Sequence, residues 1–278
     1  MNRAWRDRLL MIGMGLGVLA LGFAAVRVAL PKRPVPYDHE RGLLPTLVTN
    51  EPEPPPAPRC PSGVIAWSSG NTAAFHAMGE EGDRGLAVRN HVSISGESRN
   101  GRRSFEFNGN TSFVEFKEQN RLRNLPRFTL AAWIKAAPEP RFRGIVGKIQ
   151  SQEPRSGYLL NLNAEDRLRC DVVHDHATSR FGAAVSDIPV ADDTWHHVAC
   201  TYDGNNVKVF VDGVQRGSKS YGGAVGITDE PLLVGKDPFA FENRHFQGHI
   251  DDVAIFSRPL PEEELTTLMS LTAEQCKW

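Results

Sequence analysis

The sequence predicts an all-β protein built as an antiparallel sandwich of two sheets. Many short runs of alternating apolar residues are separated by turn residues, a pattern typical of antiparallel strands and not of βαβ units. The clearest runs lie between Trp195 and Arg216, where two alternating segments flank the polar loop 203–206 and a second turn, Asp212-Gly213, follows. Asp-Gly between β-branched residues is a strong hairpin signal. This stretch is therefore predicted to be a three-stranded meander with one face in a core.

The composition allows one such sandwich together with an N-terminal appendage. The chain has 278 residues, of which 40% are hydrophobic, and its formal net charge is −1. A balance so close to neutral gives no support to nucleic-acid binding. The four cysteines include no Cys-x-x-Cys pair, which excludes thioredoxin-type redox motifs and zinc ribbons.

Residues 1–30 are predicted to anchor the chain in a membrane through a signal-anchor helix at about residues 9–30. Leu9 to Val26 is a run of 18 residues without a charge. A spanning helix needs about 17–25 residues, whereas the apolar part of a cleaved signal peptide has about 7–15. Cleavage near the small residues Gly22 and Ala24 is the alternative. A very short basic N-terminus is typical of a helix whose N-terminus stays in the cytoplasm, which places the large domain on the other side of the membrane.

Residues 31–59 are predicted to form an extended linker. Nine of these residues are prolines. A proline-rich chain favours polyproline II, which extends by about 3.1 Å per residue and cannot bury a core. The globular domain is then expected to run from Cys60 to residue 278.

The domain is expected to consist of short strands and one C-terminal helix. Turn residues at 108–110 and 164–166 separate neighbouring strands. A helix is expected to begin at Pro261, because proline suits a first helical position and the three glutamates that follow suit the positive end of the helix dipole. The predicted strands are 63–67, 92–94, 105–107, 113–116, 128–135, 145–149, 158–163, 168–173, 197–202, 207–211, 232–235 and 248–256.

Five segments in this order resemble one known family. They are SFEFNG at 104–109, FTLAAWIK at 128–135, GYLL at 157–160, WHHVACTYDG with VKVFVDG at 195–213, and GHIDDVAIFSRPL at 248–260. Together they resemble the laminin G-like (LamG-like), concanavalin A-like jelly-roll domains over roughly residues 100–268. The resemblance implies a two-sheet jelly-roll sandwich, and some LamG-type domains bind sulfated or acidic polysaccharides through basic loops.

The four cysteines are expected to form two disulfides, although four cysteines allow three pairings. Cys60 and Cys276 bracket the domain, and the resemblance implies that the first and last strands lie close together, so these two are expected to pair. Cys170 and Cys200 lie in the middle of predicted strands, in phase with neighbours that should face inward. Disulfides persist in oxidising compartments, which favours an extracytoplasmic domain.

Some sandwiches of this family are glycosidases. Glucanases of this fold carry Glu-x-Asp-x-x-Glu on one strand, which aligns three acids, and this spacing does not occur here. Gly-x-Ser-x-Gly, His-Glu-x-x-His and a P-loop are also missing from the sequence. The sequence therefore predicts that the protein is not an enzyme, and a divergent glycoside hydrolase is the least favoured alternative.

The candidate ligand-binding residues are basic. Between residues 99 and 143, ten lysines and arginines stand against four acids, a local net charge of +6. Arginine forks suit sulfate, phosphate or carboxylate groups, so an acidic polysaccharide is a candidate ligand. Ordinary solvated loop charge is the alternative. The four candidates are Arg121, Arg123, Arg141 and Arg143.

Calcium is the ion that the resemblance implies, held by oxygen ligands in loops at one rim of the sandwich. The candidate ligands are Asp192, Asp193, Asp251 and Asp252. Asn108 stands where the family usually has an aspartate. Capping of strand ends is the alternative role for the four aspartates.

The expected function is that of a membrane-tethered, extracytoplasmic binding or adhesion module without catalysis. Its expected partner is a polysaccharide or a protein of the cell envelope, with no nucleic acid involved. The alternative is a structural subunit of an envelope assembly that makes contacts with proteins only.

Overall fold

The computed structural model of the protein describes residues 58–68, 75–77, 87–99, 103–116, 120–174, 181–239 and 243–276. All of these belong to one unit that begins at Pro56. The predicted membrane helix, and the predicted linker up to residue 57, lie outside the described residues. Within the described part of the chain, no helix is long and apolar enough to cross a membrane.

Sixteen strands and three helices are found in the described segments. Nine strands form sheet A: β1 (Val64–Ser68), β2 (Phe75–Ala77), β4 (Ser93–Ser95), β5 (Ser104–Asn108), β7 (Phe128–Lys135), β12 (Trp195–Tyr202), β13 (Asn206–Val211), β14 (Val214–Ser220) and β16 (Gln247–Phe256). Seven form sheet B: β3 (Ala87–Asn90), β6 (Phe113–Phe116), β8 (Arg143–Gln150), β9 (Ser156–Leu162), β10 (Arg167–Val173), β11 (Phe181–Pro189) and β15 (Leu232–Val234). The helices are α1 (Asn120–Arg123), α2 (Glu262–Ser270) and α3 (Ala273–Cys276).

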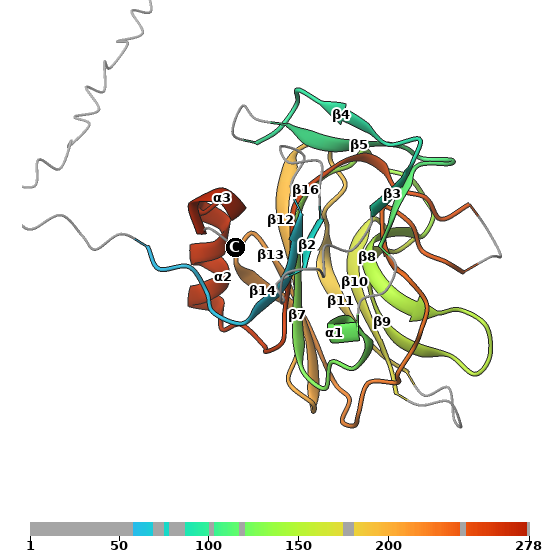
Figure 1. The fold of residues 1–278 in the computed structure, drawn as a ribbon, viewed down its shortest axis with the longest axis vertical. Coiled ribbons are helices and arrows are strands. Elements are labelled where there is room, and N and C mark those ends of the chain that lie inside the picture. The colour runs from blue at the N-terminus through green and yellow to red at the C-terminus, as the bar shows by residue number, and fades with distance from the viewer. Residues whose placement is uncertain are drawn as a thin grey trace, which may run out of the picture. The chain divides into compact units, whose positions relative to one another are not determined.

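The two sheets face each other and enclose the main core (Figure 1). Sheet A has the order β14-β13-β12-β7-β16-β1-β2, with β5 and β4 attached through β16, and sheet B has the order β11-β10-β9-β8-β15-β6-β3. Each pair of neighbouring strands is antiparallel, as the register of β7 against β12 illustrates. The predicted antiparallel sandwich of two sheets is therefore confirmed.

The predicted meander forms β12, β13 and β14, which are neighbours in sheet A. Successive side chains of a strand point to opposite faces. Accordingly Val207, Val209 and Val211 are buried in the main core, whereas Phe210 is buried on the other face of the sheet. Both faces of sheet A are covered at this point, so neither face of β13 exposes its apolar side chains to solvent.

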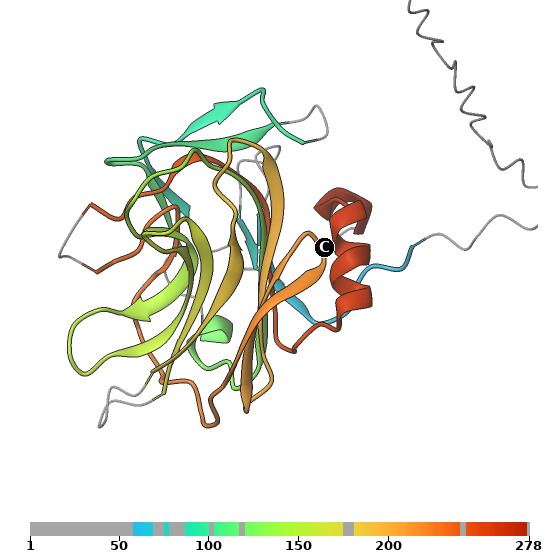
Figure 2. The same ribbon diagram turned by 180° about the vertical axis from the view of Figure 1, so that it is seen from behind.

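The second cover is the C-terminal helix α2, which packs on the face of sheet A that points away from sheet B (Figure 1, Figure 2). Leu265 and Leu268 of the helix are buried against Phe210, Phe256 and Trp67 of the sheet. The helix begins directly after Pro261, with Glu262 to Glu264 in its first turn, as the sequence predicted. Burial of these apolar side chains holds the helix in place.

Two disulfides are present, with the partners expected from the sequence. Cys170 of β10 is joined to Cys200 of β12, so this bond links sheet B to sheet A inside the main core. Cys60, just before β1, is joined to Cys276 at the end of α3.

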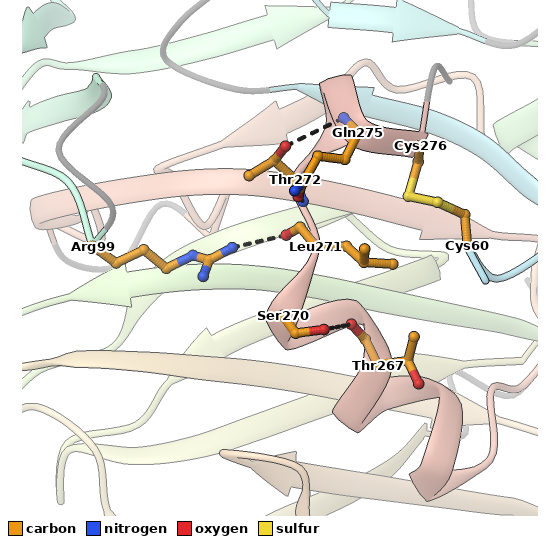
Figure 3. Close-up of a disulfide and its surroundings, with 8 residues drawn as sticks. All are labelled: Cys60, Arg99, Thr267, Ser270, Leu271, Thr272, Gln275 and Cys276. Atoms are coloured by element: carbon orange, nitrogen blue, oxygen red, sulfur yellow. Dashed lines mark hydrogen bonds between the residues drawn. A yellow bond between two sulfur atoms is a disulfide. The ribbon is translucent and has the colours of Figure 1, made fainter. Parts of the chain in front are cut away.

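The C-terminal segment is also held by hydrogen bonds around the second disulfide (Figure 3). The side chain of Gln275 accepts a bond from the backbone N–H of Thr272 at 2.8 Å, and the Thr272 hydroxyl accepts one from the N–H of Gln275 at 3.3 Å. This reciprocal pair is a capping box. The guanidinium of Arg99 donates to the carbonyl oxygen of Leu271 at 2.8 Å, which ties the end of α2 to the sandwich.

His197 is a buried imidazole on the outer face of sheet A. It is 2% exposed, and its ring packs edge-on against Trp133 with a centroid distance of 5.4 Å. Burial, followed by the nearby positive charge of Arg99, lowers the pKa of His197 to about 3, and the carboxylate of Asp212 opposes this only in part. The folded protein therefore keeps this imidazole neutral in mildly acidic solution.

We expect His197→Gln to make the protein less sensitive to acid. The unfolded chain binds a proton at His197 below pH 6.5, whereas the folded protein does not until about pH 3. Stability contributed by the neutral ring is therefore present above pH 6.5 and is lost as the pH falls through this window. Between pH 7 and pH 5 the loss from this one group is about 2 kcal/mol. Urea unfolding of both proteins at the two pH values measures it, and an identical acid sensitivity would contradict the assignment.

Candidate functional site

A cavity of about 220 Å³ opens on the outer face of sheet B. Sheet A is covered on its outer face by α2, so the two sheets differ in what they offer to a ligand. The cavity combines aromatic rings, guanidinium groups, carboxylates and one amide. Its lining residues are Phe142, Ile149, Arg155, Asn161, Arg169, Asp171, Val173, Phe181, Asp237, Phe239 and Arg244.

Strand alternation explains why charged residues gather there. In β10, Leu168, Cys170 and Val172 point into the core. Arg169 and Asp171 lie between them in the sequence and must therefore point outward. Across the sheet, the partner of Arg169 in β9 is Asn161, as the pairing of the two strands shows.

The connection from β15 to β16 supplies the other side of the cavity. It brings Asp237, Phe239 and Arg244 over the start of β8. The close approach requires Gly144, because a Cβ atom there would lie 2.2 Å from the carbonyl carbon of Lys236. Glycine is the residue that permits backbone to pass this near.

Each guanidinium group of the cavity is paired with a carboxylate. Arg169 binds Asp171 with two nitrogens, Nε to Oδ2 at 3.0 Å and Nη2 to Oδ1 at 2.6 Å. Arg244 Nη1 donates to Asp237 Oδ2 at 3.0 Å. Arg155 Nε lies 3.1 Å from Glu153 Oε1. Bidentate and charge-assisted bonds of this kind fix side-chain geometry as well as stabilising it.

Asp237 is the most deeply buried acid of the cavity, with 1% of its side chain exposed. Burial raises the pKa of its carboxyl group, and the bonds from the Phe239 N–H and from Arg244 only partly oppose this. Both of its oxygens accept hydrogen bonds, Oδ1 from the Phe239 N–H and Oδ2 from Arg244. The carboxyl group therefore ties Phe239 and Arg244 to Asp237.

Guanidinium groups also lie over the aromatic rings. Arg244 is 4.7 Å from the ring centroid of Phe142, Arg155 is 5.2 Å from that of Phe239, and Arg169 is 5.9 Å from that of Phe181. Such cation–π contacts hold rings and cations in a fixed arrangement. The cavity is thus built in advance from side chains that restrain one another.

Asn161 is a polar lining side chain whose amide oxygen has no hydrogen-bond partner among the described residues. It is 1% exposed, and its Nδ2 donates to Asp171 Oδ2 at 2.8 Å. Its Oδ1 is buried and has no hydrogen-bond partner among the described residues. A buried polar atom without a partner typically destabilises a fold by about 1–3 kcal/mol, so this oxygen is a natural contact for a donor on a ligand.

This arrangement suits recognition of a small polar ligand better than it suits catalysis. Fixed rings with a few convergent polar groups are typical of binding pockets. Glycoside hydrolysis needs two carboxyl groups that act on the bond or on water. In this cavity the oxygens of Asp171 and Asp237 accept bonds from Arg169, Asn161, Arg244 and the Phe239 N–H, which gives both acids a structural role.

The four arginines predicted to bind a polyanion do not come together. Arg123 of α1 pairs with Asp229, Nε to Oδ1 at 2.7 Å, and the two line a surface hollow with Gln150 at the end of β8. Arg143 is at the beginning of β8. The strand β8 has eight residues from Arg143 to Gln150, which places its two ends about 23 Å apart. Arg121, exposed on α1, lies with Arg123.

Arg141 and Arg143 are also bound within the protein. Arg141 Nη2 donates to the carbonyl oxygen of Gly109 at 3.0 Å. Arg143 is fully buried, donates to the carbonyl oxygen of Ala137 at 2.8 Å and forms an ion pair with Asp166. The four arginines therefore do not form one surface, because Arg141 and Arg143 bind within the protein and lie far from Arg121 and Arg123.

The four aspartates predicted to bind calcium have separate structural roles. Asp192 accepts a bond from the N–H of Thr194 at 3.0 Å, and Asp193 has a positive φ of 66° in the turn before β12. Asp251 is 2% exposed, and Asp252 pairs with Arg99 at 3.4 Å. Within the described segments there is no group of three His, Cys, Asp or Glu residues that could hold a metal ion.

Asn108 also has a structural role. Its Oδ1 accepts bonds from the backbone N–H groups of residues 110, 111 and 112 at 2.9 to 3.1 Å. This is the turn-forming use of an Asn side chain, and it occupies the oxygen that a metal would need.

Comparison with known families agrees with the fold. The family model described as the concanavalin A-like lectin/glucanases superfamily, Laminin_G_3, matches residues 108–266, which is more than half of the chain. The chain belongs to this family. The resemblance seen in the sequence motifs is thereby confirmed. No curated protein shows significant similarity in sequence.

Several solved structures share the fold of this LamG-like domain. The botulinum neurotoxin serotype D ligand-binding domain in complex with N-acetylneuraminic acid has a TM-score of 0.59 at 14% identity, over 75% of this chain and 50% of that one. Domain 4 of AbnA, a GH43 extracellular arabinanase from Geobacillus stearothermophilus, in complex with arabinotriose, has a TM-score of 0.57 at 15% identity, over 74% and 98%. The binding domain of Paraclostridial Mosquitocidal Protein 1 has a TM-score of 0.58 at 13% identity, over 74% and 51%.

The LamG-like chain spans about half the length of these two toxin chains. At such low identities the likeness shows the fold alone.

Sequence reasoning missed every residue of the cavity. One signal was available: Arg169 and Asp171 alternate with the inward residues of a buried strand, so they had to meet on its outer face. Phe239 and Arg244 had no such signal, because only the folded loop brings them to β8.

We expect Gly144→Ala to displace Lys236 and Asp237 and to damage the cavity. The added methyl group would meet backbone atoms of these two residues at 2.2 to 2.4 Å, so they must move. Overpacking of this kind destabilises a protein by about 1–3 kcal/mol. Gly96→Ala is the matched control, because a Cβ atom there has no neighbour within 4 Å. Urea unfolding compares the two, and equal stabilities would show that Lys236 and Asp237 do not press on Gly144.

Proposed function

We propose that this protein is a non-catalytic module that binds a glycan in the cavity on the outer face of sheet B. The observation that carries the proposal is Phe181. This ring lines the cavity and is 55% exposed, while polar groups fixed by ion pairs lie beside it. A sugar ring has an apolar C–H face and a polar rim, so it matches an exposed aromatic face next to fixed donors and acceptors.

The family and the similar structures support this proposal. The family description names lectins together with glucanases. One similar structure is a domain in complex with arabinotriose, and another is a ligand-binding domain in complex with N-acetylneuraminic acid. The use of Asp171 and Asp237 as partners of arginines favours the lectin-like function over the glucanase-like one.

We further propose that the module works outside the cytoplasm and is held at a membrane. Two disulfides close the domain, and such bonds persist in oxidising compartments. The uncharged run from Leu9 to Val26 has the length of a spanning helix. In this proposal residues 31–59 are the spacer, and the domain of residues 60–278 presents its cavity to polysaccharides of the cell envelope.

We expect Phe181→Ala to weaken glycan binding by about tenfold or more, because one aromatic contact of this kind contributes about 1.4 kcal/mol or more. Phe181 is largely exposed, so its removal should leave the stability nearly unchanged. Ile227→Ala is the matched control: Ile227 is also an exposed apolar side chain, at 42%, and it lines a different hollow.

The measurement is a glycan array probed with the full chain and the two variants. Binding of a glycan that Phe181→Ala loses and Ile227→Ala keeps supports the proposal. Binding that neither change affects would place the glycan site elsewhere. If no glycan is bound and only envelope proteins are retained, the protein is a structural subunit of an envelope assembly instead.

A further inference from the structure

The side chains that line the cavity on the outer face of sheet B indicate whether its ligand is charged. This step rests on the proposed function, since it asks which glycans the same site accepts. Two chemical classes are in question: uncharged sugars, which offer only hydroxyl groups and ether oxygens, and acidic sugars, which carry a carboxylate or sulfate.

Asn161 shows what the ligand must supply. The amide Nδ2 donates to Asp171 Oδ2 at 2.8 Å, and because an ionised carboxylate can only accept, the orientation of the amide is fixed. The acceptor Oδ1 is therefore the atom left for the ligand, and it has no partner among the described residues. Asn161 is almost completely buried, with 1% of the residue exposed. An acceptor in this position needs a donor such as a hydroxyl group, and it would repel a carboxylate.

Two of the three arginines of the cavity are balanced by a carboxylate of its lining. Arg169 and Arg244 pair with Asp171 and Asp237, at 2.6 and 3.0 Å, whereas the partner of Arg155 at 3.1 Å is Glu153, which is 61% exposed and does not line the cavity. A carboxylate on a ligand would approach Asp171 and Asp237, and it would have to displace one of them to be bound by the fork of Arg169 or Arg244. Loss of a fixed, partly buried pair is unfavourable. A neutral sugar meets no such obstacle, because its hydroxyl groups can accept from guanidinium N–H groups and donate to oxygens in their present positions.

The size and the walls of the cavity suit one sugar ring. Its volume of about 220 Å³ lies below the about 300 Å³ at which most drug-sized pockets begin. Phe181 forms an exposed wall, and the guanidinium group of Arg169 lies 5.9 Å from its ring centroid. The C–H face of a sugar ring can lie on such a wall.

From these observations we infer that the cavity selects an uncharged sugar residue, whose hydroxyl group donates to Asn161 Oδ1, and rejects acidic sugars.

The test uses a matched pair of ligands, galactotriose and trigalacturonic acid, which differ in a hydroxymethyl group against a carboxylate on each ring, together with arabinotriose and N-acetylneuraminic acid. Calorimetric titration of the full chain should give tighter binding of the neutral ligands, by about tenfold or more. Their affinity should hardly change between about 50 and 500 mM salt, because no net charge is neutralised on binding.

Two variants test the residues. Asn161→Ala should lose about tenfold in affinity for the neutral ligand, and Asn205→Ala, an exposed asparagine on the β12–β13 loop, is its control. Asp171→Asn keeps the shape of the side chain and leaves Arg169 without its carboxylate. This variant should shift the selectivity towards trigalacturonic acid, which a purely structural role of Asp171 would not do.

The outcomes separate this inference from the function on which it rests. Preference for an acidic ligand, or equal affinity for both members of the pair, with either lost in Phe181→Ala, would overturn the inference and keep the glycan-binding function. Neutral binding that Asn161→Ala and Asp171→Asn leave unchanged would also overturn the inference. If no ligand of either class is bound, the proposed function itself fails.

Discussion

The bond between Cys170 and Cys200 is the constraint on which the fold and the cavity both depend. It crosses the core from β10 to β12 and closes a sequence separation of 30 residues, for which the chain-entropy model gives about 3–4 kcal/mol of stabilisation. Because Cys170 must point inward to reach its partner, its neighbours Arg169 and Asp171 must point outward. The disulfide therefore fixes the phase of the strand that carries the central ion pair of the cavity.

Strand periodicity predicted most of the fold, and its failures have a physical cause. The valines of β13 occupy alternate positions and β7 is rich in apolar residues, and the predicted bounds of both strands agree with the structure within a residue or two. The strand β11 was missed because its inward residues include Gly182, Ala184 and Ser186, which are too small or too polar to give an alternating signal. The cover of sheet A by α2 was also not predicted, although Phe210 on the far side of β13 was a sign of it.

The site was far less predictable than the fold, because charge in a sequence does not show its partners. Arg143 contributed to a basic segment, yet it is buried against Asp166, 23 residues later in the chain. Arg141 donates to Gly109, 32 residues earlier. The cavity in turn depends on the contact of Gly144 with residues 236 and 237. Such long-range contacts carry no local pattern, so the local net charge did not indicate which side chains meet in the folded protein.

The most direct test of the account is to locate the bound sugar by nuclear magnetic resonance. The full chain, labelled with ¹⁵N, is titrated with arabinotriose and with galactotriose, and the shifts of the backbone amides are followed. The account predicts the largest changes at Asn161, at residues 169–173 of β10 and at Phe181, with little change in α2 or near Arg123. Changes concentrated at Arg123 and Asp229, or on the face covered by α2, would contradict it.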